Sequence, residues 1–224
     1  ENKSSKWAIE HDFFESSFGS LYRGMHTFLS APKERRDLLM LKRSPRVNEN
    51  AELKGYYGEF QELSLKVRQA KDLFLIIGPP GTGKTSYGLV NTLKEELLHD
   101  DTSVLLLSYT NRAIDEICSK LLEESIDFIR IGNHTSCSRE YHPFLLENKT
   151  ASCRNVNALR QLITSTRVFV GTTTAFNSHT SLFSIKQFSL AIIDEASQIL
   201  EPHLMGILCA SSNNKSAVSK FVMI

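Results

Sequence analysis

Gly78-Pro79-Pro80-Gly81-Thr82-Gly83-Lys84-Thr85 follows directly after the apolar run Leu73-Phe74-Leu75-Ile76-Ile77. The octapeptide fits the pattern G-x-x-x-x-G-K-[ST], in which glycines let successive backbone N–H groups converge on phosphates and the next helix adds its positive dipole end. Lys84 is then expected at the β- and γ-phosphates, and the Thr85 hydroxyl at Mg²⁺. A glycine-rich turn that merely ends a strand is the alternative, but every fixed position is matched in the right context. The sequence therefore predicts a site for ATP and Mg²⁺ over residues 78–86, Ser86 included.

Short apolar runs alternate with helical stretches from Leu73 onward. The runs span residues 73–77, 104–107, 128–131, 168–170, 190–193 and 221–224. Such alternation predicts an α/β fold with a parallel sheet and helices on both of its faces. Strands buried on both sides read as continuous apolar runs, and ligands gather at their carboxyl ends. Residues 132–166 interrupt the alternation, so we expect an insertion there, with a short helix near residues 156–163.

A different pattern precedes these runs. Apolar residues at steps of three and four predict an amphipathic helix that ends at Pro32 and packs on the core: Phe14, Phe18, Leu21, Tyr22, Met25, Phe28 and Leu29. Basic residues follow, and they form either a solvated face or a phosphate-contacting one, of which we favour the first: Lys33, Arg35, Arg36, Lys42, Arg43 and Arg46.

Composition narrows the class of protein. The 224 residues include 26 Lys and Arg against 25 Asp and Glu, so the overall charge gives no argument for a polyanionic partner. The sequence shows neither an apolar run of membrane-spanning length nor the residue series of a secretory signal. Its four cysteines form no C-x-x-C pair, which favours free thiols in a reducing compartment. We therefore expect part of a longer intracellular protein, cytoplasmic or nuclear, with no membrane partner.

A second element completes the predicted ATP site. The apolar run 190–193 ends in the adjacent carboxylates Asp194 and Glu195. Asp194 at the strand end is suited to hold Mg²⁺ with Thr85, and Glu195 to orient and deprotonate the attacking water. Adjacent acidic residues are usually only a solvated turn or a helix start, but this pair follows a buried strand downstream of a phosphate loop. We therefore assign Glu195 and Lys84 as catalytic residues.

Several further motifs together resemble one family, the Upf1-like (DNA2/NAM7-type) helicases of superfamily 1. The phosphate loop matches the family's motif I, residues 194–198 match its DEAxQ motif, and residues 201–202 continue it as Glu-Pro. Residues 108–115 resemble motif Ia, residues 170–174 resemble motif Ic, and Gln61 stands 17 residues before Gly78, at the place of the Q motif. The resemblance covers residues 57–224 and implies the first RecA-like domain of a helicase.

The resemblance assigns roles to these motifs. Gln61 is expected to read the adenine edge, unless it is a surface glutamine of a helix. Thr110, Asn111 and Arg112 follow one strand, and Thr172, Thr173 and Thr174 end another, so both groups are expected to bind the backbone of single-stranded DNA or RNA. An ordinary helix cap at Asn111 and a β-prone strand end at the threonines are the alternatives.

The resemblance also predicts a division of the chain and what lies outside it. Residues 1–56 are expected to form a helical accessory or stalk segment, and residues 57–224 a RecA-like domain that stops before motif III. A second RecA-like domain, with arginines that stabilise the transferred phosphoryl group, is the expected partner, so the chain alone should hydrolyse ATP poorly. Two other functions stay open at this point: an AAA+ ATPase, which shares the phosphate loop, and a nucleotide-switched nucleic-acid-binding scaffold. The choice between DNA and RNA and the direction of movement also stay open.

Overall fold

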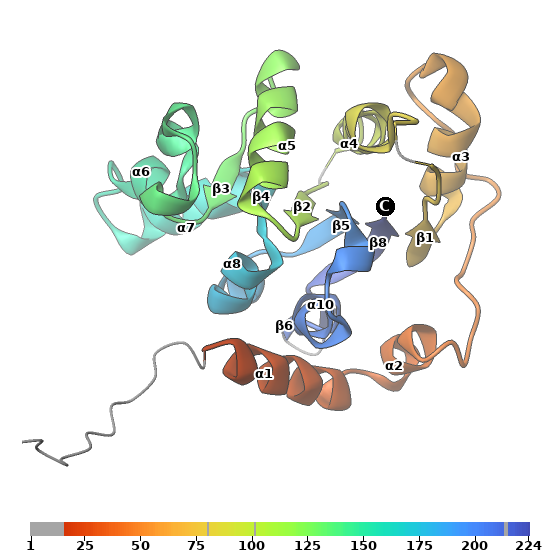
Figure 1. Ribbon diagram of the computed structural model, residues 1–224, viewed down its shortest axis with the longest axis horizontal. Helices are drawn as coiled ribbons and strands as arrows, with labels where there is room; N and C mark the ends of the chain where they lie inside the picture. Colours follow the sequence, from red (N-terminus) through yellow and green to blue (C-terminus); the bar gives the residue numbers. More distant parts are fainter. Residues whose placement is uncertain (1–15, 80, 101, 213–214) are drawn as a thin grey trace, which may run out of the picture.

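Six parallel strands form the central sheet of the protein (Figure 1). The computed structural model describes residues 16–79, 81–100, 102–212 and 215–224. The strands are β1 (Leu73–Leu75), β2 (Val104–Ser108), β3 (Ile129–Ile131), β4 (Val168–Thr172), β5 (Phe188–Ile193) and β8 (Val218–Met223). Their order across the sheet is β1-β8-β5-β2-β4-β3, and all neighbouring pairs are parallel. The predicted α/β fold is confirmed, and each predicted apolar run lies on one of these strands.

Helices cover both faces of the sheet, as predicted. The helices are α1 (Ser16–Ser30), α2 (Lys33–Leu39), α3 (Gln61–Gln69), α4 (Val90–Leu97), α5 (Asn111–Glu123), α6 (Leu146–Thr150), α7 (Val156–Ser165), α8 (Thr173–Ser178), α9 (Leu182–Ile185) and α10 (Glu201–Leu208). In Figure 1, α3, α4 and α5 lie on one side of the strands, and α8 and α10 lie on the other. The side chains between each layer and the sheet form two separate apolar clusters. A short antiparallel hairpin, β6 (Ser211–Ser212) and β7 (Lys215–Ser216), precedes β8.

Helix α1 corrects the prediction that its apolar stripe belongs to the core. The helix packs against α10 so closely that a methyl group on Gly24 would overlap the carbonyl oxygen of Pro202. Phe18, Tyr22 and Leu29 lie on another side of the helix and are exposed. The predicted helix and its packing are confirmed, but the prediction was wrong for the exposed side chains of the stripe. Small residues such as Gly24 and Gly206, which allow close approach of two helix backbones, determine which face of α1 is buried. Phe14 of the predicted stripe lies outside the described residues.

The basic segment around α2 also differs from its prediction. Arg35 is buried, lies over the ring of Phe221 at 4.5 Å and donates to the carbonyl oxygen of Val218 at 2.9 Å. Arg43 and Arg46 both pair with the buried carboxylate of Asp72, at 2.8 and 3.2 Å. Three of these cations therefore attach the segment before α3 to the sheet. The prediction of a solvated face was wrong for the buried Arg35 and the half-buried Arg43, whereas Arg46 is exposed.

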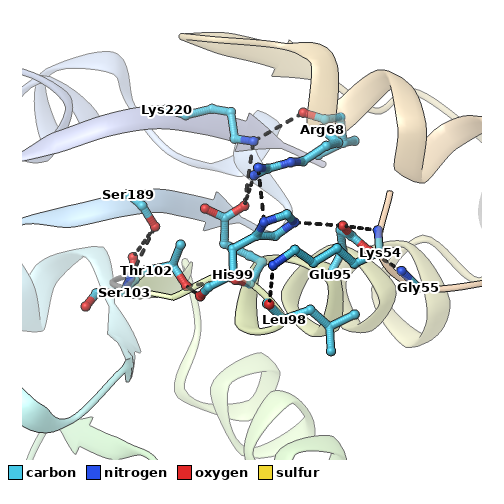
Figure 2. A network of polar contacts seen from close by, with 12 residues as sticks. Lys54, Gly55, Arg68, Glu95, Leu98, His99, Thr102, Ser103, Ser189 and Lys220 are labelled. Carbon is cyan, nitrogen blue, oxygen red and sulfur yellow. Dashed lines mark hydrogen bonds and ion pairs between the residues drawn. The ribbon is translucent and has the colours of Figure 1, made fainter. Parts of the chain in front are cut away.

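A polar network joins α3 and α4 to the sheet and to the segment before α3 (Figure 2). Glu95 accepts hydrogen bonds from the backbone N–H groups of Lys54 at 2.9 Å and Gly55 at 3.0 Å. Its carboxylate also contacts His99 Nε2 at 2.9 Å and the Tyr57 hydroxyl at 2.8 Å. The three contacts with Lys54, Gly55 and Tyr57 fix residues 54–57 against α4.

Next to this carboxylate, Glu96 pairs with charged residues of two other elements. Its carboxylate lies 3.4 Å from Arg68 of α3 and 3.9 Å from Lys220 of β8. Lys220 also donates to the carbonyl oxygen of Val67 at 3.3 Å. The charges of this corner therefore satisfy one another where α3, α4 and β8 meet.

The predicted insertion between β3 and β4 contains α6 and α7, beside β3 at the end of the sheet farthest from β1 (Figure 1). The expected short helix near residues 156–163 is confirmed by α7. In the part of the chain that the structure describes, no helix is long and apolar enough to cross a membrane.

Candidate nucleotide and nucleic-acid sites

The phosphate loop lies between β1 and a π-helical turn, Lys84–Leu89, that leads into α4. Gly81 and Gly83 have φ angles of 78° and 77°, which other residues rarely adopt. Gly83 also leaves no room for a side chain, because an added Cβ would lie 2.6 Å from the ring of Tyr87. The two glycines therefore meet a backbone requirement of the loop. Pro80 lies outside the described residues, and the side chain of Ser86 is likewise not described.

Lys84 lies over this loop. Its Nζ donates to the carbonyl oxygens of Gly78 and of Pro79, the second at 3.0 Å. The Thr82 hydroxyl donates to the same Pro79 oxygen at 2.9 Å. The ammonium group therefore lies at the rim of the loop, where the sequence predicted contact with phosphate.

Thr85 and Asp194 are brought together from opposite parts of the domain. The Thr85 hydroxyl donates to Asp194 Oδ1 at 3.1 Å, and Asp194 is 3% exposed. Burial raises the pKa of the Asp194 carboxyl, the hydrogen bond from Thr85 acts in the opposite direction, and the neighbouring Glu195 raises it further. Hard oxygen ligands of this kind suit Mg²⁺, and a cation here would offset the burial of the carboxylate. The residues present therefore fit the predicted ion.

Glu195 has an unusual backbone conformation. Its φ of 51° lies in the left-handed region, which costs a non-glycine residue about 1–2 kcal/mol. The turn sends Glu195 to the surface directly after the buried Asp194. The backbone N–H of Ala196 donates to the carbonyl oxygen of Ile224 at 2.9 Å, which fixes this turn beside the end of β8. The two acidic side chains thus occupy different environments, as their different predicted roles require.

The phosphate loop and both carboxylates line one cleft of about 1160 Å³. Its other wall is apolar and comes from α2, the end of β1 and α10: Leu38, Leu39, Leu41, Leu75, Ile77, Leu200 and Leu204. The cleft therefore has room for a nucleotide, with its polar groups gathered on one side.

Gln61 forms a hydrogen bond within its own segment and does not line the cleft. It also does not line a second, smaller cavity, which is formed by residues around Phe60 and Tyr87. It begins α3, and its Oε1 accepts a hydrogen bond from the backbone N–H of Tyr57 at 2.8 Å. The side chain thereby closes the turn before α3, and a contact with adenine stays a prediction.

An aromatic pair next to Gln61 was missed by the sequence analysis. The rings of Phe60 and Tyr87 stack at 5.4 Å, beside Gly83 of the phosphate loop. They line a cavity of about 500 Å³ together with Tyr56, Tyr57, Glu59, Asn91 and Lys94. The sequence did contain a signal for this pair. Phe60 directly precedes Gln61, and Tyr87 lies one helical turn after the phosphate loop.

The predicted nucleic-acid contacts lie on neighbouring strand ends. Ser108 of β2 and Thr172 of β4 are in register, so the turns that follow them start side by side. Thr110 caps α5 by accepting a hydrogen bond from the backbone N–H of Ala113 at 3.2 Å. Asn111 and Arg112 come next and are exposed. The cap of α5 is therefore Thr110, and the amide of Asn111 is left for another contact.

The three threonines after β4 do not share one environment. The Thr172 hydroxyl accepts a hydrogen bond from the backbone N–H of Ala175 at 3.1 Å, which caps α8. Thr173 is 1% exposed, whereas Thr174 is exposed. The expectation that all three hydroxyls face a ligand was wrong for Thr173, because its side chain turns into the core as the helix begins.

Comparison with known proteins supports the resemblance to superfamily 1 helicases. The model of a family described as "AAA domain" matches residues 61–167. The DNA replication ATP-dependent helicase/nuclease JHS1 of Arabidopsis thaliana is 30% identical over 92% of this chain, which spans 16% of that protein. The DNA replication ATP-dependent helicase/nuclease DNA2 of Homo sapiens is 37% identical over 70% of this chain and is matched over 14% of its own length. The chain carries a superfamily 1 helicase domain of the DNA2 and Upf1-like type.

The fold of this helicase domain has solved counterparts. The UvsW helicase from bacteriophage T4 matches 87% of the chain with a TM-score of 0.51 and 14% identity, over 60% of its own chain. The helicase domain spans only about one sixth of the curated relatives quoted above. In this chain, the predicted nucleotide-binding elements follow β1 and β5, which lie on either side of β8, and the predicted nucleic-acid elements follow the adjacent β2 and β4.

Proposed function

We propose that this domain binds ATP and Mg²⁺ and is the first motor domain of a helicase that couples ATP hydrolysis to movement on single-stranded nucleic acid. The observation that supports it most is the 3.1 Å hydrogen bond between Thr85 and Asp194, which joins the phosphate loop to the acidic pair inside one cleft. The names of the relatives favour DNA as the track.

Each residue of the cleft has a proposed part in hydrolysis. Backbone N–H groups of residues 78–85 and the Lys84 ammonium hold the phosphates, and Thr85 and Asp194 hold the ion. Mg²⁺ bound there would supply charge neutralisation at the phosphates. Glu195 orients a water molecule and accepts its proton.

The adenine and ribose extend from the loop toward the segment before α3. Gln61 and the stacked Phe60 and Tyr87 are the proposed contacts, since the pair lies beside Gly83. The amide oxygen of Gln61 already accepts from Tyr57, so its Nε2 is the group proposed to read the base.

Movement requires that the grip on the track change with the nucleotide. Asn111, Arg112 and Thr174 are the proposed backbone contacts. Strand β5, which leads to Asp194, is paired with β2, which leads to Asn111. We propose that a second RecA-like domain closes on the cleft, supplies the arginines and completes the track. The division into residues 1–56 and 57–224, and an intracellular location, belong to the same proposal.

Steady-state ATP hydrolysis by the full-length protein tests this function. We expect stimulation by single-stranded DNA, weaker or none by RNA, and loss of turnover in Lys84→Ala. The isolated chain should bind nucleotide but turn over little. Binding of ATP without turnover under any condition would favour a nucleotide-switched scaffold instead, and turnover indifferent to both polymers would remove the proposed track.

A further inference from the structure

A buried arginine lies behind the proposed nucleic-acid turn. Arg130 of β3 is 1% exposed, and its guanidinium group lies 5.7 Å from the ring of Tyr141. Its Nη1 donates to Asp115 of α5, and its Nη2 donates to the carbonyl oxygen of Ser136 at 3.2 Å. The N–H groups of a guanidinium buried this deeply need hydrogen-bond acceptors. Here the acceptors come from two separate elements, α5 and the insertion after β3.

Asp115 extends this contact to the insertion. Its second carboxylate oxygen accepts from the Ser138 hydroxyl at 2.6 Å and from the Ser138 backbone N–H at 3.3 Å. Residues 133–136 are themselves fixed, because Asn133 and Ser136 cap each other at 3.0 and 3.3 Å. The carboxylate of Asp115 therefore joins α5 to Arg130 of β3 and to Ser138 of the insertion, two residues after this turn.

The position of Asp115 on its helix gives this contact its consequence. Asp115 lies four residues after Asn111, so the two side chains share one face of α5, one turn apart. The direction of the first turn of α5 is then set by Thr110 at its start and by Asp115 one turn further on.

Stability alone is a weak reason for such a cluster. An ion pair removed from water gains little net stability over well-packed apolar side chains, whereas it fixes the relative orientation of its elements. Arg167 provides a comparison at the start of β4. It donates to the carbonyl oxygens of Leu97 at 2.9 Å, His99 at 2.6 Å and Thr102 at 3.0 Å. The Arg167 hydrogen bonds lie at the amino ends of the strands, whereas the proposed nucleic-acid contacts lie at the carboxyl ends of β2 and β4.

We propose that Arg130 and Asp115 are positioning residues for nucleic-acid binding, which hold the first turn of α5 so that Asn111 and Arg112 face the backbone of the track. The inference rests on the proposed function. Neither residue touches the nucleic acid in this account, and both act through the orientation of α5.

The test is ATP hydrolysis by the full-length protein as a function of the concentration of an oligo-dT strand. Arg130→Gln and the isosteric Asp115→Asn should raise the half-saturating concentration of the strand roughly 2- to 30-fold, the range found for residues that couple sites without touching a ligand. The rate at saturating strand should be retained. Arg130→Lys keeps the charge and should restore part of the affinity. Arg167→Gln is the matched control and should leave the half-saturating concentration unchanged.

Two further variants separate this inference from the function on which it rests. Asn111→Ala and Arg112→Gln remove proposed direct contacts and should weaken strand activation. If they do so while Asp115→Asn and Arg130→Gln behave like Arg167→Gln, the positioning role is refuted and the proposed function stands. If Asn111→Ala and Arg112→Gln have no effect, the proposed track is wrong and the positioning role falls with it. Since Asp115→Asn changes no side-chain volume, it decides the matter even if Arg130→Gln fails to fold.

Discussion

Replacement of Glu95 by glutamine should destabilise the protein strongly at neutral pH and hardly at all in acid. The Glu95 side chain is buried, with 3% exposure, and accepts hydrogen bonds from Lys54 and Gly55 (Figure 2). It also accepts a hydrogen bond from the Tyr57 hydroxyl. Burial by itself would raise the pKa of this carboxyl, but the hydrogen bonds from Lys54, His99, Tyr57 and Gly55 outweigh it and lower the pKa from 4.5 to about 2.

The size of the effect follows from this pKa. At about 1.4 kcal/mol per pKa unit, the ionised Glu95 contributes roughly 3 kcal/mol to folding. A carboxyl whose pKa is lower in the folded state stabilises fully above its unfolded pKa of 4.5, and the contribution is lost as the pH falls toward about 2. In Glu95→Gln one oxygen becomes an NH₂ group that faces donors, so the contribution is absent at every pH.

Urea unfolding followed by circular dichroism measures this difference. The free energies of unfolding of the wild type and Glu95→Gln should differ by roughly 3 kcal/mol near neutral pH and converge as the pH falls to about 2. Glu62→Gln is the control, because Glu62 is an exposed residue paired with Lys66 across one turn of α3 and should not show this pH-dependent difference. The reasoning is refuted if Glu95→Gln matches the wild type at neutral pH, or if the difference persists unchanged in acid.

The remaining predictions concern the cleft and are measured in the full-length protein. Glu195→Gln should retain ATP binding, measured by fluorescence anisotropy of a labelled analogue, and lose about 10²- to 10⁴-fold in turnover; normal turnover would show that another group is the base. Thr85→Ala should raise the Mg²⁺ concentration needed for half-maximal hydrolysis, and an unchanged Mg²⁺ dependence would remove Thr85 from the ion site. Lys84→Ala should weaken nucleotide binding itself, whereas Lys84→Arg should keep part of it, so equal binding by all three proteins would contradict a phosphate contact.

The sheet could be predicted from the sequence because most of its strands are buried on both sides and therefore read as largely apolar runs. The strand limits could not, since polar residues lie near the starts of β5 and β8, Ser189 in the first and Ser219 and Lys220 in the second. Ser189 hydrogen bonds to Ser103 across 2.9 Å, and Lys220 pairs with Glu96. These two polar side chains can lie within a strand because they bond to residues that are distant in the sequence. A local sequence pattern does not reveal such partners.

The candidate site also has parts that the sequence predicts and parts that it does not. A local pattern predicts the phosphate loop and the acidic pair, because backbone conformation and side-chain chemistry are both encoded within a few residues. The burial of Thr173 depends on where α8 starts, and the contacts of Arg130 depend on α5 and the insertion. Arg130 left one signal in the sequence, a charge within the apolar run 128–131. The exposure of Tyr22 likewise follows from the close packing of α1 on α10, which periodicity does not predict.

In the proposed motor, nucleotide binding in the cleft changes the affinity of the strand ends beside it for nucleic acid. The most direct measurement is the affinity of the full-length protein for an oligo-dT strand without nucleotide, with a non-hydrolysable ATP analogue and with ADP. We expect affinities that differ between these states by about 5- to 150-fold, the usual range of coupling between two sites, and a loss of the difference in Lys84→Ala. An affinity that is the same in all three states, in a protein shown to bind both nucleotides, would contradict it.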